Sequence, residues 1–183
     1  MATIRQEQIL STAAALFAER GFHGVSVHDI GAACGVSGPA LYRHFPGKDA
    51  ILSEMLVGIS HTLRTGGRTR VDQATDAKEA LDALVAFHID FALTNPALIV
   101  VQEREWTNLD ESSREQVREL QLGYVDTWVG ALRSLRPDLD QRTARAAVQA
   151  TFGLLNSTPH SARISEDAMA ELLTQMARRA LLG

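Results

Sequence analysis

Residues 25–48 read VSVHDIGAACGVSGPALYRHFPGK. Ser26 and Asp29 have the spacing of a capping box, in which each side chain accepts a hydrogen bond from the backbone N–H of the other residue. Glycine adopts the left-handed backbone that ends many helices, so Gly35 indicates that a helix stops near Cys34. The first half of the segment therefore predicts a short helix from about residue 27 to residue 34.

The second half of the segment predicts another short helix. Ser37 is a suitable N-cap, and Pro39 falls in the first turn, where a missing N–H costs little. Leu41 and Phe45 would face the core, and the helix would end before Pro46. Two short helices joined by a glycine-containing turn are typical of a helix-turn-helix.

The charge of this segment differs from that of the rest of the chain. The whole protein of 183 residues has a net charge of −4, yet no acidic residue lies between Gly35 and Lys48, where Arg43 and His44 also occur. A helix-turn-helix exposes the N-terminal residues of its second helix to base edges in the major groove. The pattern favours DNA binding, and a helical protein–protein adaptor without DNA binding remains the alternative.

The remainder of the chain is also predicted to be helical, because apolar residues recur at helical spacing and no segment alternates with period two. We expect an all-α fold of about nine helices. Besides the two short helices, they comprise a first helix ending at Gly21 and helices over about 49–64, 75–94, 97–106, 112–135, 140–157 and 165–182. The pair Gly66-Gly67 is expected to break the fourth helix.

Residues 5–55 resemble the N-terminal DNA-binding module of TetR-type transcriptional repressors. The resemblance implies a homodimer that binds a palindromic operator with two recognition helices about one DNA turn apart. It also implies a C-terminal helical domain that dimerises and binds a small molecule, which divides the chain into residues 1–48 and 49–183. The elements that carry the resemblance are the Gly21 turn, Ser26, Asp29-Ile30, Gly35-Val36-Ser37, Leu41-Tyr42, His44-Phe45 and Lys48.

The resemblance assigns roles to individual residues of the segment. Ser26, Tyr42, His44 and Lys48 match positions that contact phosphates. The positions that can approach bases are His28, Gly38, Pro39, Ala40 and Arg43, and Ser37 lies on the same exposed side. Residues 38–40 offer no side-chain amide or charge, so Arg43 with guanine, apolar contacts with thymine methyl groups and DNA shape would carry specificity.

The last two predicted helices carry apolar stripes that are wider than one intramolecular contact needs, and their small residues allow close helix packing. We expect them to form a dimer interface, although an intramolecular core would give the same pattern. The residues expected in this interface are Val148, Thr151, Leu155, Met169, Leu173 and Met176.

The middle helices combine aromatic rings with polar tips, a composition that suits a ligand cavity with a few orienting polar groups. The effector would be a small apolar or aromatic molecule, such as a lipid-like or acyl compound, although the same residues would also suit a packed core. The candidate ligand-binding residues are His88, Phe91, Glu103, Trp106, Tyr124 and Trp128.

Several other classes of protein are excluded by what the sequence lacks. It has no G-x-S-x-G elbow, P-loop or G-x-G-x-x-G motif, so we expect no enzyme and no cofactor. Its histidines form no H-E-x-x-H motif and Cys34 is its single cysteine, so we expect no metal site. It has no run of about 18 apolar residues and no signal-peptide core, which predicts a cytoplasmic protein without a membrane partner.

Overall fold

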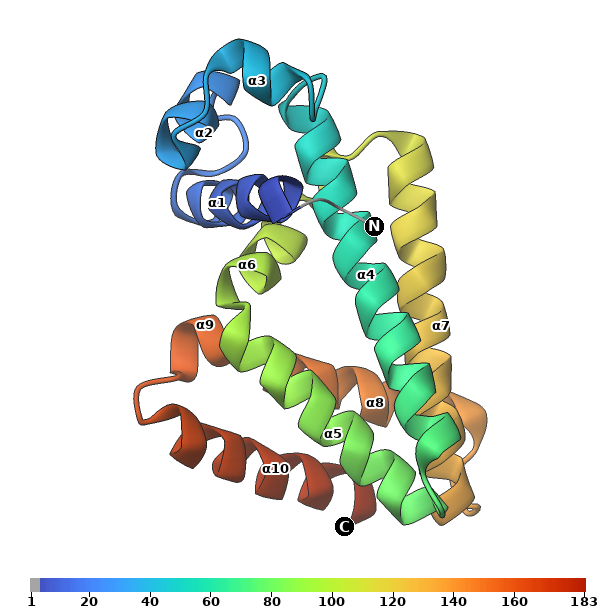
Figure 1. Cartoon of the computed structure of the whole chain (residues 1–183). Coiled ribbons are helices and arrows are strands. Elements are labelled where there is room, and N and C mark those ends of the chain that lie inside the picture. The colour runs from blue at the N-terminus through green and yellow to red at the C-terminus, as the bar shows by residue number, and fades with distance from the viewer. Residues whose placement is uncertain (1–3) are drawn as a thin grey trace. The chain divides into compact units, whose positions relative to one another are not determined.

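The computed structural model describes residues 4–183, and these residues are helical throughout (Figure 1). All nine predicted helices are present, which confirms the all-α class, and the four-residue helix α9 is an addition. The elements are α1 (Ile4–Arg20), α2 (Val27–Cys34), α3 (Gly38–Tyr42), α4 (Lys48–Gln73), α5 (Ala77–Thr94), α6 (Pro96–Glu105), the 3-10 helix η1 (Trp106–Asn108), α7 (Glu111–Leu135), α8 (Gln141–Leu155), α9 (Thr158–Ser161) and α10 (Glu166–Leu182).

The chain forms two compact units, each assembled from two segments. The first unit comprises Met1–Ile59 and Ala97–Val117, and the second comprises Ser60–Pro96 and Arg118–Gly183. Helices α4 and α7 each contribute one part to the first unit and the other part to the second.

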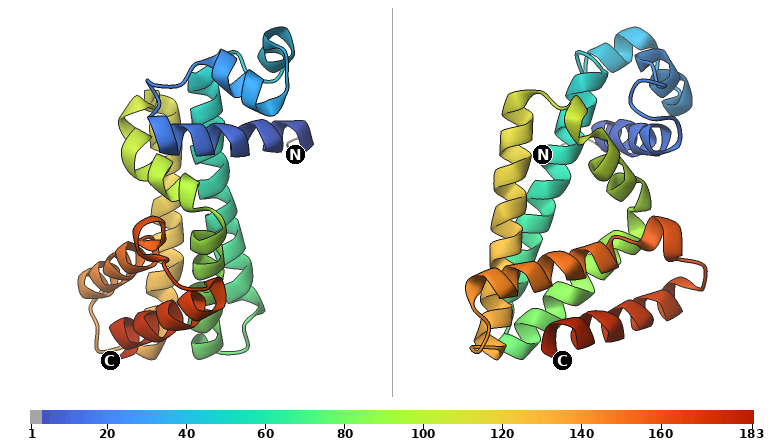
Figure 2. Two further views of the ribbon diagram at one scale, coloured as in Figure 1. Left: turned by 90° about the vertical axis from the view of Figure 1, so that its left-hand side faces the viewer. Right: turned by 180° about the vertical axis from the view of Figure 1, so that it is seen from behind.

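The first unit has a core to which all of its helices contribute. Ile9 of α1, Ile30 of α2, Leu41 of α3, Leu52 of α4 and Val101 of α6 have no solvent-exposed surface. Within this unit α1 lies across the start of α4, as Figures 1 and 2 show. This shared core fixes the positions of the short helices α2 and α3, which are too short to be stable alone.

The second unit is built around α5, which packs against α10 and α8, while α8 also packs against α10. The apolar faces of these helices are buried together with Trp128 and Leu132 of α7. The inward-facing residues of the predicted apolar stripes on α8 and α10 therefore belong to a core within the single chain.

The predicted break at Gly66-Gly67 is wrong, because α4 continues to Gln73. A Cβ atom on Gly66 would lie 2.4 Å from the Phe87 ring, and one on Gly67 would lie 2.5 Å from the Tyr124 ring. Both distances are far below van der Waals contact. The two glycines therefore let α4 approach the aromatic side chains of α5 and α7, and tertiary packing outweighs their low helix propensity of about 1 kcal/mol each.

No single helix in residues 4–183 is long and apolar enough to cross a membrane. The bent pair formed by α5 and residues Pro96–Asn108 passes that test by length and composition only when the two parts are taken together.

Candidate functional site

The start of α2 is fixed by the predicted capping box. The Asp29 N–H donates to Ser26 Oγ over 3.1 Å, and the Ser26 N–H donates to Asp29 Oδ2 over 2.8 Å. The hydrogen bonds from the Ser26 side chain and backbone lower the pKa of the Asp29 carboxyl. An ionised carboxylate at a helix N-terminus also interacts favourably with the helix dipole, so α2 begins at a defined residue.

The turn after α2 depends on Gly35, whose φ is +64°, in the left-handed region. In this conformation the Gly35 N–H donates to Ala32 O over 3.2 Å, and the Val36 N–H donates to Gly31 O over 2.8 Å. These bonds supply donors to carbonyl groups at the end of the helix that would otherwise lack a hydrogen-bond partner. The chain reverses here and enters α3.

Helix α3 differs in two details from the prediction. Ser37 occupies the N-cap position and Pro39 lies in the first turn, but the Ser37 side chain makes no capping hydrogen bond. The helix ends at Tyr42, although Phe45 still donates its N–H to Leu41 O over 3.0 Å and is buried. The second helix of this helix-turn-helix is therefore five residues long and is followed by a turn.

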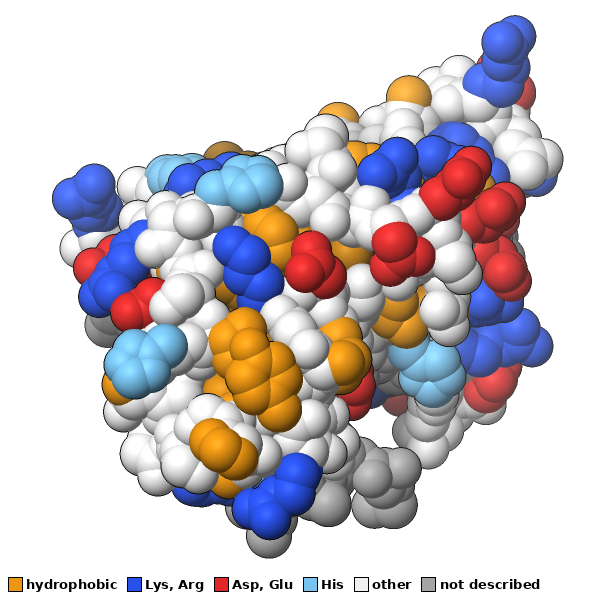
Figure 3. Space-filling model, turned by 90° about the horizontal axis from the view of Figure 1, so that it is seen from above, with side chains coloured by type: hydrophobic (Ala, Val, Ile, Leu, Met, Phe, Trp, Pro, Cys, Tyr) orange, Lys and Arg blue, Asp and Glu red, His pale blue; other side chains and the backbone are white. Residues whose placement is uncertain are grey.

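None of the residues predicted to contact DNA is buried in this unit. Tyr42 stands out, because 56% of this large aromatic side chain is exposed. Figure 3 views the chain from the side on which α3 lies in Figure 1, and basic, histidine, hydrophobic and acidic side chains all occur there. Ser26, His28, Ser37, Pro39, Tyr42 and Arg43 are exposed, while Gly38, Ala40, His44 and Lys48 are half-buried.

A hollow of about 650 Å³ joins the start of α2 to the turn before α4. Its lining brings together four residues that the sequence analysis selected, Ser26, His28, Tyr42 and Lys48. The lining combines groups that suit an anion, namely a helix N-terminus, a phenol, an imidazole and an ammonium group, with the carboxylates of Asp29 and Asp49. The hollow is therefore of mixed charge.

Lys48 has a second set of contacts that the sequence did not indicate. Its Nζ donates to Phe22 O over 2.9 Å and to Val25 O over 3.1 Å, and it lies 4.4 Å from the centre of the Phe22 ring. These partners are more than 20 residues away in the chain, so no local spacing reveals them. Lys48 therefore fastens the loop before α2 to the start of α4.

Four of the six predicted ligand-binding residues converge in the second unit. His88 and Phe91 of α5 form ring contacts of about 6 Å between centres, and His88 also contacts the rings of Tyr124 and Trp128 on α7. All four side chains are buried. The other two predicted residues, Glu103 and Trp106, belong to the first unit, where Glu103 is exposed and Trp106 is half-buried.

Two residues that complete this cluster were not predicted from the sequence, the aromatic Phe152 and the polar Asn156. The Phe152 ring stacks on His88 with 4.7 Å between centres, and His88 Nε2 lies 3.0 Å from Asn156 Oδ1. Phe152 follows Val148 at the i+4 spacing of one helix face, which was the available signal. Asn156 follows the end of α8, and no sequence pattern indicated its contact with His88.

The ring nitrogens of His88 both have partners, since Nδ1 lies 3.2 Å from Tyr124 Oη. Burial lowers the pKa of His88 to about 4, while the Asn156 contact acts weakly in the opposite direction. The imidazole is therefore neutral at pH 7. Nearby, Trp128 Nε1 is buried and meets no hydrogen-bond acceptor among the described residues.

The buried His88 predicts that the protein becomes less stable in mild acid. An unfolded chain protonates His88 below a pKa of about 6.5, whereas the folded chain protonates it only near pH 4. The unfolded state thus binds more protons in this window, so the free energy of unfolding should fall by up to about 3 kcal/mol as the pH drops through it. Urea denaturation at several pH values measures this loss.

A His88→Leu variant should lack this part of the pH dependence, so that its stability difference from the wild type shrinks as the pH falls. His160→Gln is the matched control, because His160 is exposed in the same unit. A wild-type and a His88→Leu protein with parallel pH profiles would contradict the assignment of a neutral, buried His88.

The predicted dimer residues are mostly buried within the single chain. Val148, Thr151, Leu155, Met169 and Leu173 are each at most 5% exposed, and only Met176, at 43%, faces outward. Met176 shares its exposed face of α10 with Leu172, which is also 43% exposed. Of the six predicted residues, only Met176 therefore lies on the outer surface of the single chain, whereas the other five pack inside it.

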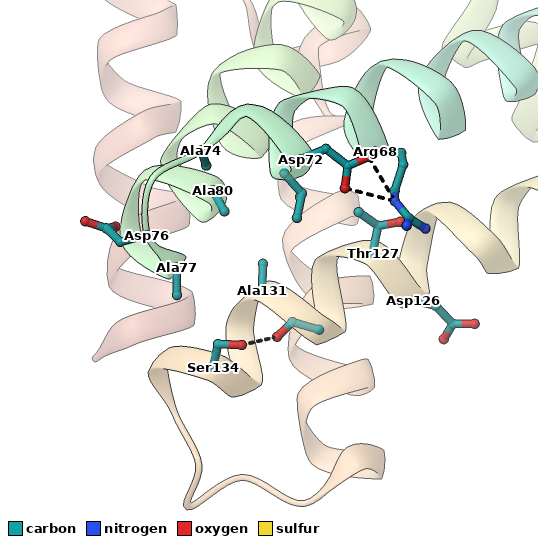
Figure 4. Close-up of a pocket in the computed structure, with 12 residues that line it drawn as sticks. Arg68, Asp72, Ala74, Asp76, Ala77, Ala80, Asp126, Thr127, Ala131 and Ser134 are labelled. Atoms are coloured by element: carbon teal, nitrogen blue, oxygen red, sulfur yellow. Dashed lines mark hydrogen bonds and ion pairs between the residues drawn. The ribbon is translucent and has the colours of Figure 1, made fainter.

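A further hollow of about 410 Å³ lies in the second unit between the end of α4, the start of α5 and α7 (Figure 4). Its carboxylates have partners: Asp72 accepts from Arg68 Nε over 3.2 Å, and Asp126 pairs with Arg145. No three His, Cys, Asp or Glu side chains in residues 4–183 are arranged to hold a metal ion.

Comparisons with known proteins match most of the chain to bacterial transcriptional regulators. The family model of bacterial regulatory proteins, tetR family, matches residues 9–55, and a model for the tetracyclin repressor-like C-terminal domain matches residues 74–181. The HTH-type transcriptional repressor KstR2 of Rhodococcus jostii (strain RHA1) is 30% identical over 147 residues, which are 76% of this chain and 72% of that protein.

Two solved structures show the same fold. A TetR-family transcriptional regulator from Bordetella parapertussis 12822 superposes with a TM-score of 0.85 at 27% identity, covering 96% of this chain and 95% of that one. The transcriptional regulator FadR from Bacillus subtilis, solved in complex with stearoyl-CoA, superposes with a TM-score of 0.73 at 20% identity, covering 97% and 98% of the two chains.

Proposed function

Because the chain belongs to the TetR family of transcriptional regulators, which are not enzymes, we propose that it is a ligand-responsive repressor of this family. It binds a palindromic operator as a homodimer and is released by a small apolar effector. The DNA-reading surface lies in the first unit, and the effector and dimer contacts lie in the second.

The observation that carries this proposal is the α2–turn–α3 element with its outward side chains. Its caps and shared core hold α3 in one position, while the residues that resemble the family's DNA contacts remain accessible to solvent. Ser26, Tyr42 and Lys48 line one hollow, and the exposed Arg43 follows α3 directly.

Two substitutions on this surface should weaken DNA binding in different ways. Tyr42→Phe removes only a hydroxyl that we assign to a phosphate, so the affinity for all DNA sequences should fall by a similar factor of about 2–10. Arg43→Ala removes the guanidinium that we assign to a guanine, so it should cost about 1–3 kcal/mol on the operator and less on random DNA. Fluorescence anisotropy with a fragment of the protein's own promoter and a scrambled fragment measures both.

The two variants act as controls for each other, because one should preserve the ratio of specific to non-specific affinity and the other should reduce it. The roles proposed for the two residues would be contradicted if Tyr42→Phe lowered the ratio of specific to non-specific affinity and Arg43→Ala left it unchanged. Equal DNA affinity of the wild type and both variants would show that Tyr42 and Arg43 lie outside the DNA interface.

The dimer proposal rests on the outward faces of α8 and α10. Ala146, Ala150 and Gly153 are exposed small residues on α8, and a Cβ atom on Gly153 would meet nothing within 4 Å. Small residues let helices approach closely, and Leu172 and Met176 on α10 supply apolar area. A second copy of the chain related by a two-fold axis would cover both faces and would present two α3 helices to a palindrome.

The effector proposal rests on the aromatic cluster around His88. The cluster is apolar except for His88, Tyr124 and Asn156, and the buried Trp128 N–H lacks an acceptor. An apolar molecule that carries a carbonyl oxygen would satisfy this donor, which would otherwise cost about 1–3 kcal/mol. The stearoyl-CoA in the B. subtilis FadR complex contains such a part, since its thioester joins a carbonyl to an apolar acyl chain, although its coenzyme A part is charged.

A further inference from the structure

The α1–α2 turn, residues 21–26, is held from two sides at one residue, Phe22. The Phe22 N–H donates to Glu105 Oε1 of α6 over 3.2 Å. Its carbonyl oxygen accepts from Lys48 Nζ of α4 over 2.9 Å, and its ring lies beneath the same ammonium group. The backbone of Phe22 therefore connects the end of α6 to the start of α4, and these contacts all lie within the first unit.

Glu105 is a buried carboxylate, with only 5% of its surface exposed. Removing a charged group from water is costly unless hydrogen bonds replace the water, and both of its oxygens are engaged. Oε1 accepts from Phe22, and Oε2 accepts from Asn108 Nδ2 over 2.8 Å. A leucine or methionine could fill the same space without this cost, so the position uses the carboxylate for its hydrogen bonds.

The neighbouring residue strengthens the same connection. Arg104 Nη1 donates to Ala18 O, in the last turn of α1, over 2.9 Å. The end of α6 therefore holds the chain on both sides of Gly21, one contact before the turn begins and one within it. Gly21 has a φ of +75°, and a Cβ atom there would lie 3.4 Å from Arg104 and 3.8 Å from Glu105.

The turn leads directly into the DNA-reading helices, because its last residue, Ser26, is the N-cap of α2. A shift of Phe22 would change where α2 begins, and α3 would follow through the short Gly35 turn. We infer that Glu105 is a positioning residue for DNA recognition, which holds α2 and α3 in register through the Phe22 amide although it touches no DNA itself. This inference rests on the proposed function.

The test uses Glu105→Ala and Glu105→Gln in the full-length protein, with DNA from its own promoter. Glu105→Ala leaves the Phe22 N–H without its acceptor and should lower operator affinity about tenfold or more. The slope of affinity against salt concentration should stay unchanged, because no phosphate contact is removed. Glu105→Gln keeps an acceptor oxygen and should restore affinity to within about threefold of the wild type. Glu115→Ala, which removes an exposed carboxylate from the same unit, should bind like the wild type.

Amide hydrogen exchange in the free protein gives a second readout. In Glu105→Ala the Phe22 amide should exchange much faster, while amides in the middle of α1 keep their protection, which shows that the variant is folded. Faster exchange at Phe22 with wild-type operator affinity would overturn the inference and leave the proposed function intact. A loss of operator affinity in Glu105→Gln equal to that in Glu105→Ala would also overturn the inference. A wild-type protein that does not bind DNA would overturn the proposed function itself.

Discussion

Replacing Trp128 with alanine should lower the free energy of unfolding by about 3–5 kcal/mol, the range for removing a large aromatic side chain from a core. Trp128 is the largest side chain in the described residues with no exposed surface. Its ring meets Phe152 edge-on with 5.0 Å between centres, and His88 and Tyr124 at about 6 Å. Such aromatic contacts add to the burial of the ring itself. Chemical denaturation followed by circular dichroism measures the change.

Trp106→Ala is the matched control, since the only other tryptophan is half-buried at the edge of the core in the first unit. Trp106→Ala should lower the free energy of unfolding clearly less than Trp128→Ala does. The same pair of variants assigns any fluorescence change caused by the proposed apolar effector, because an effector beside the aromatic cluster should perturb Trp128 more than Trp106. A loss below about 1 kcal/mol for Trp128→Ala would mean that the cluster does not hold the second unit together.

Replacing Leu172 and Met176 together with glutamate should convert the proposed dimer to monomers and abolish high-affinity binding to a palindromic operator. Both side chains are 43% exposed in the single chain, so the glutamates would remain solvated in the monomer. In the proposed dimer they would be buried in pairs against apolar surface, which is strongly unfavourable for carboxylates. A monomer contacts only one half-site, so operator affinity should fall by at least about 100-fold.

Sedimentation or light scattering at micromolar concentration reports the assembly state directly. The control is Leu122→Glu on α7, because Leu122 is a leucine of similar exposure, 46%, on another face of the same unit. It should leave the dimer intact. Leu173 is unsuitable for this test, since it is 1% exposed and a glutamate there would unfold the chain instead. A dimeric double variant would show that α10 lies outside the interface.

The sequence was sufficient to predict α2, the Gly35 turn and the class of the fold. These features depend on residues that are close in the chain: Ser26 and Asp29 cap each other across three positions, and Gly35 supplies its own backbone conformation. Local interactions of this kind leave a pattern that can be read directly. The side-chain cap expected at Ser37 was absent, because that N-cap position makes its bonds through the backbone carbonyl alone.

Features that depend on distant residues could not be predicted. Gly66 and Gly67 normally interrupt a helix, and only the rings of Phe87 and Tyr124 explain why they do not. Lys48 has the same appearance in the sequence whether it faces a phosphate or the carbonyl of Phe22. The apolar stripes of α8 and α10 likewise could not separate inner from outer faces before their packing was seen.

Footprinting of the wild-type protein on its own promoter DNA, repeated over a range of salt concentrations, tests the central claim most directly. The claim is that two copies of the α2–α3 element read adjacent major grooves. It predicts two protected half-sites with centres about 34–36 Å apart, or a multiple of one helical turn. It also predicts that the logarithm of the affinity falls linearly with the logarithm of the salt concentration. A promoter without protected sites, or an affinity that does not change with salt, would contradict the claim.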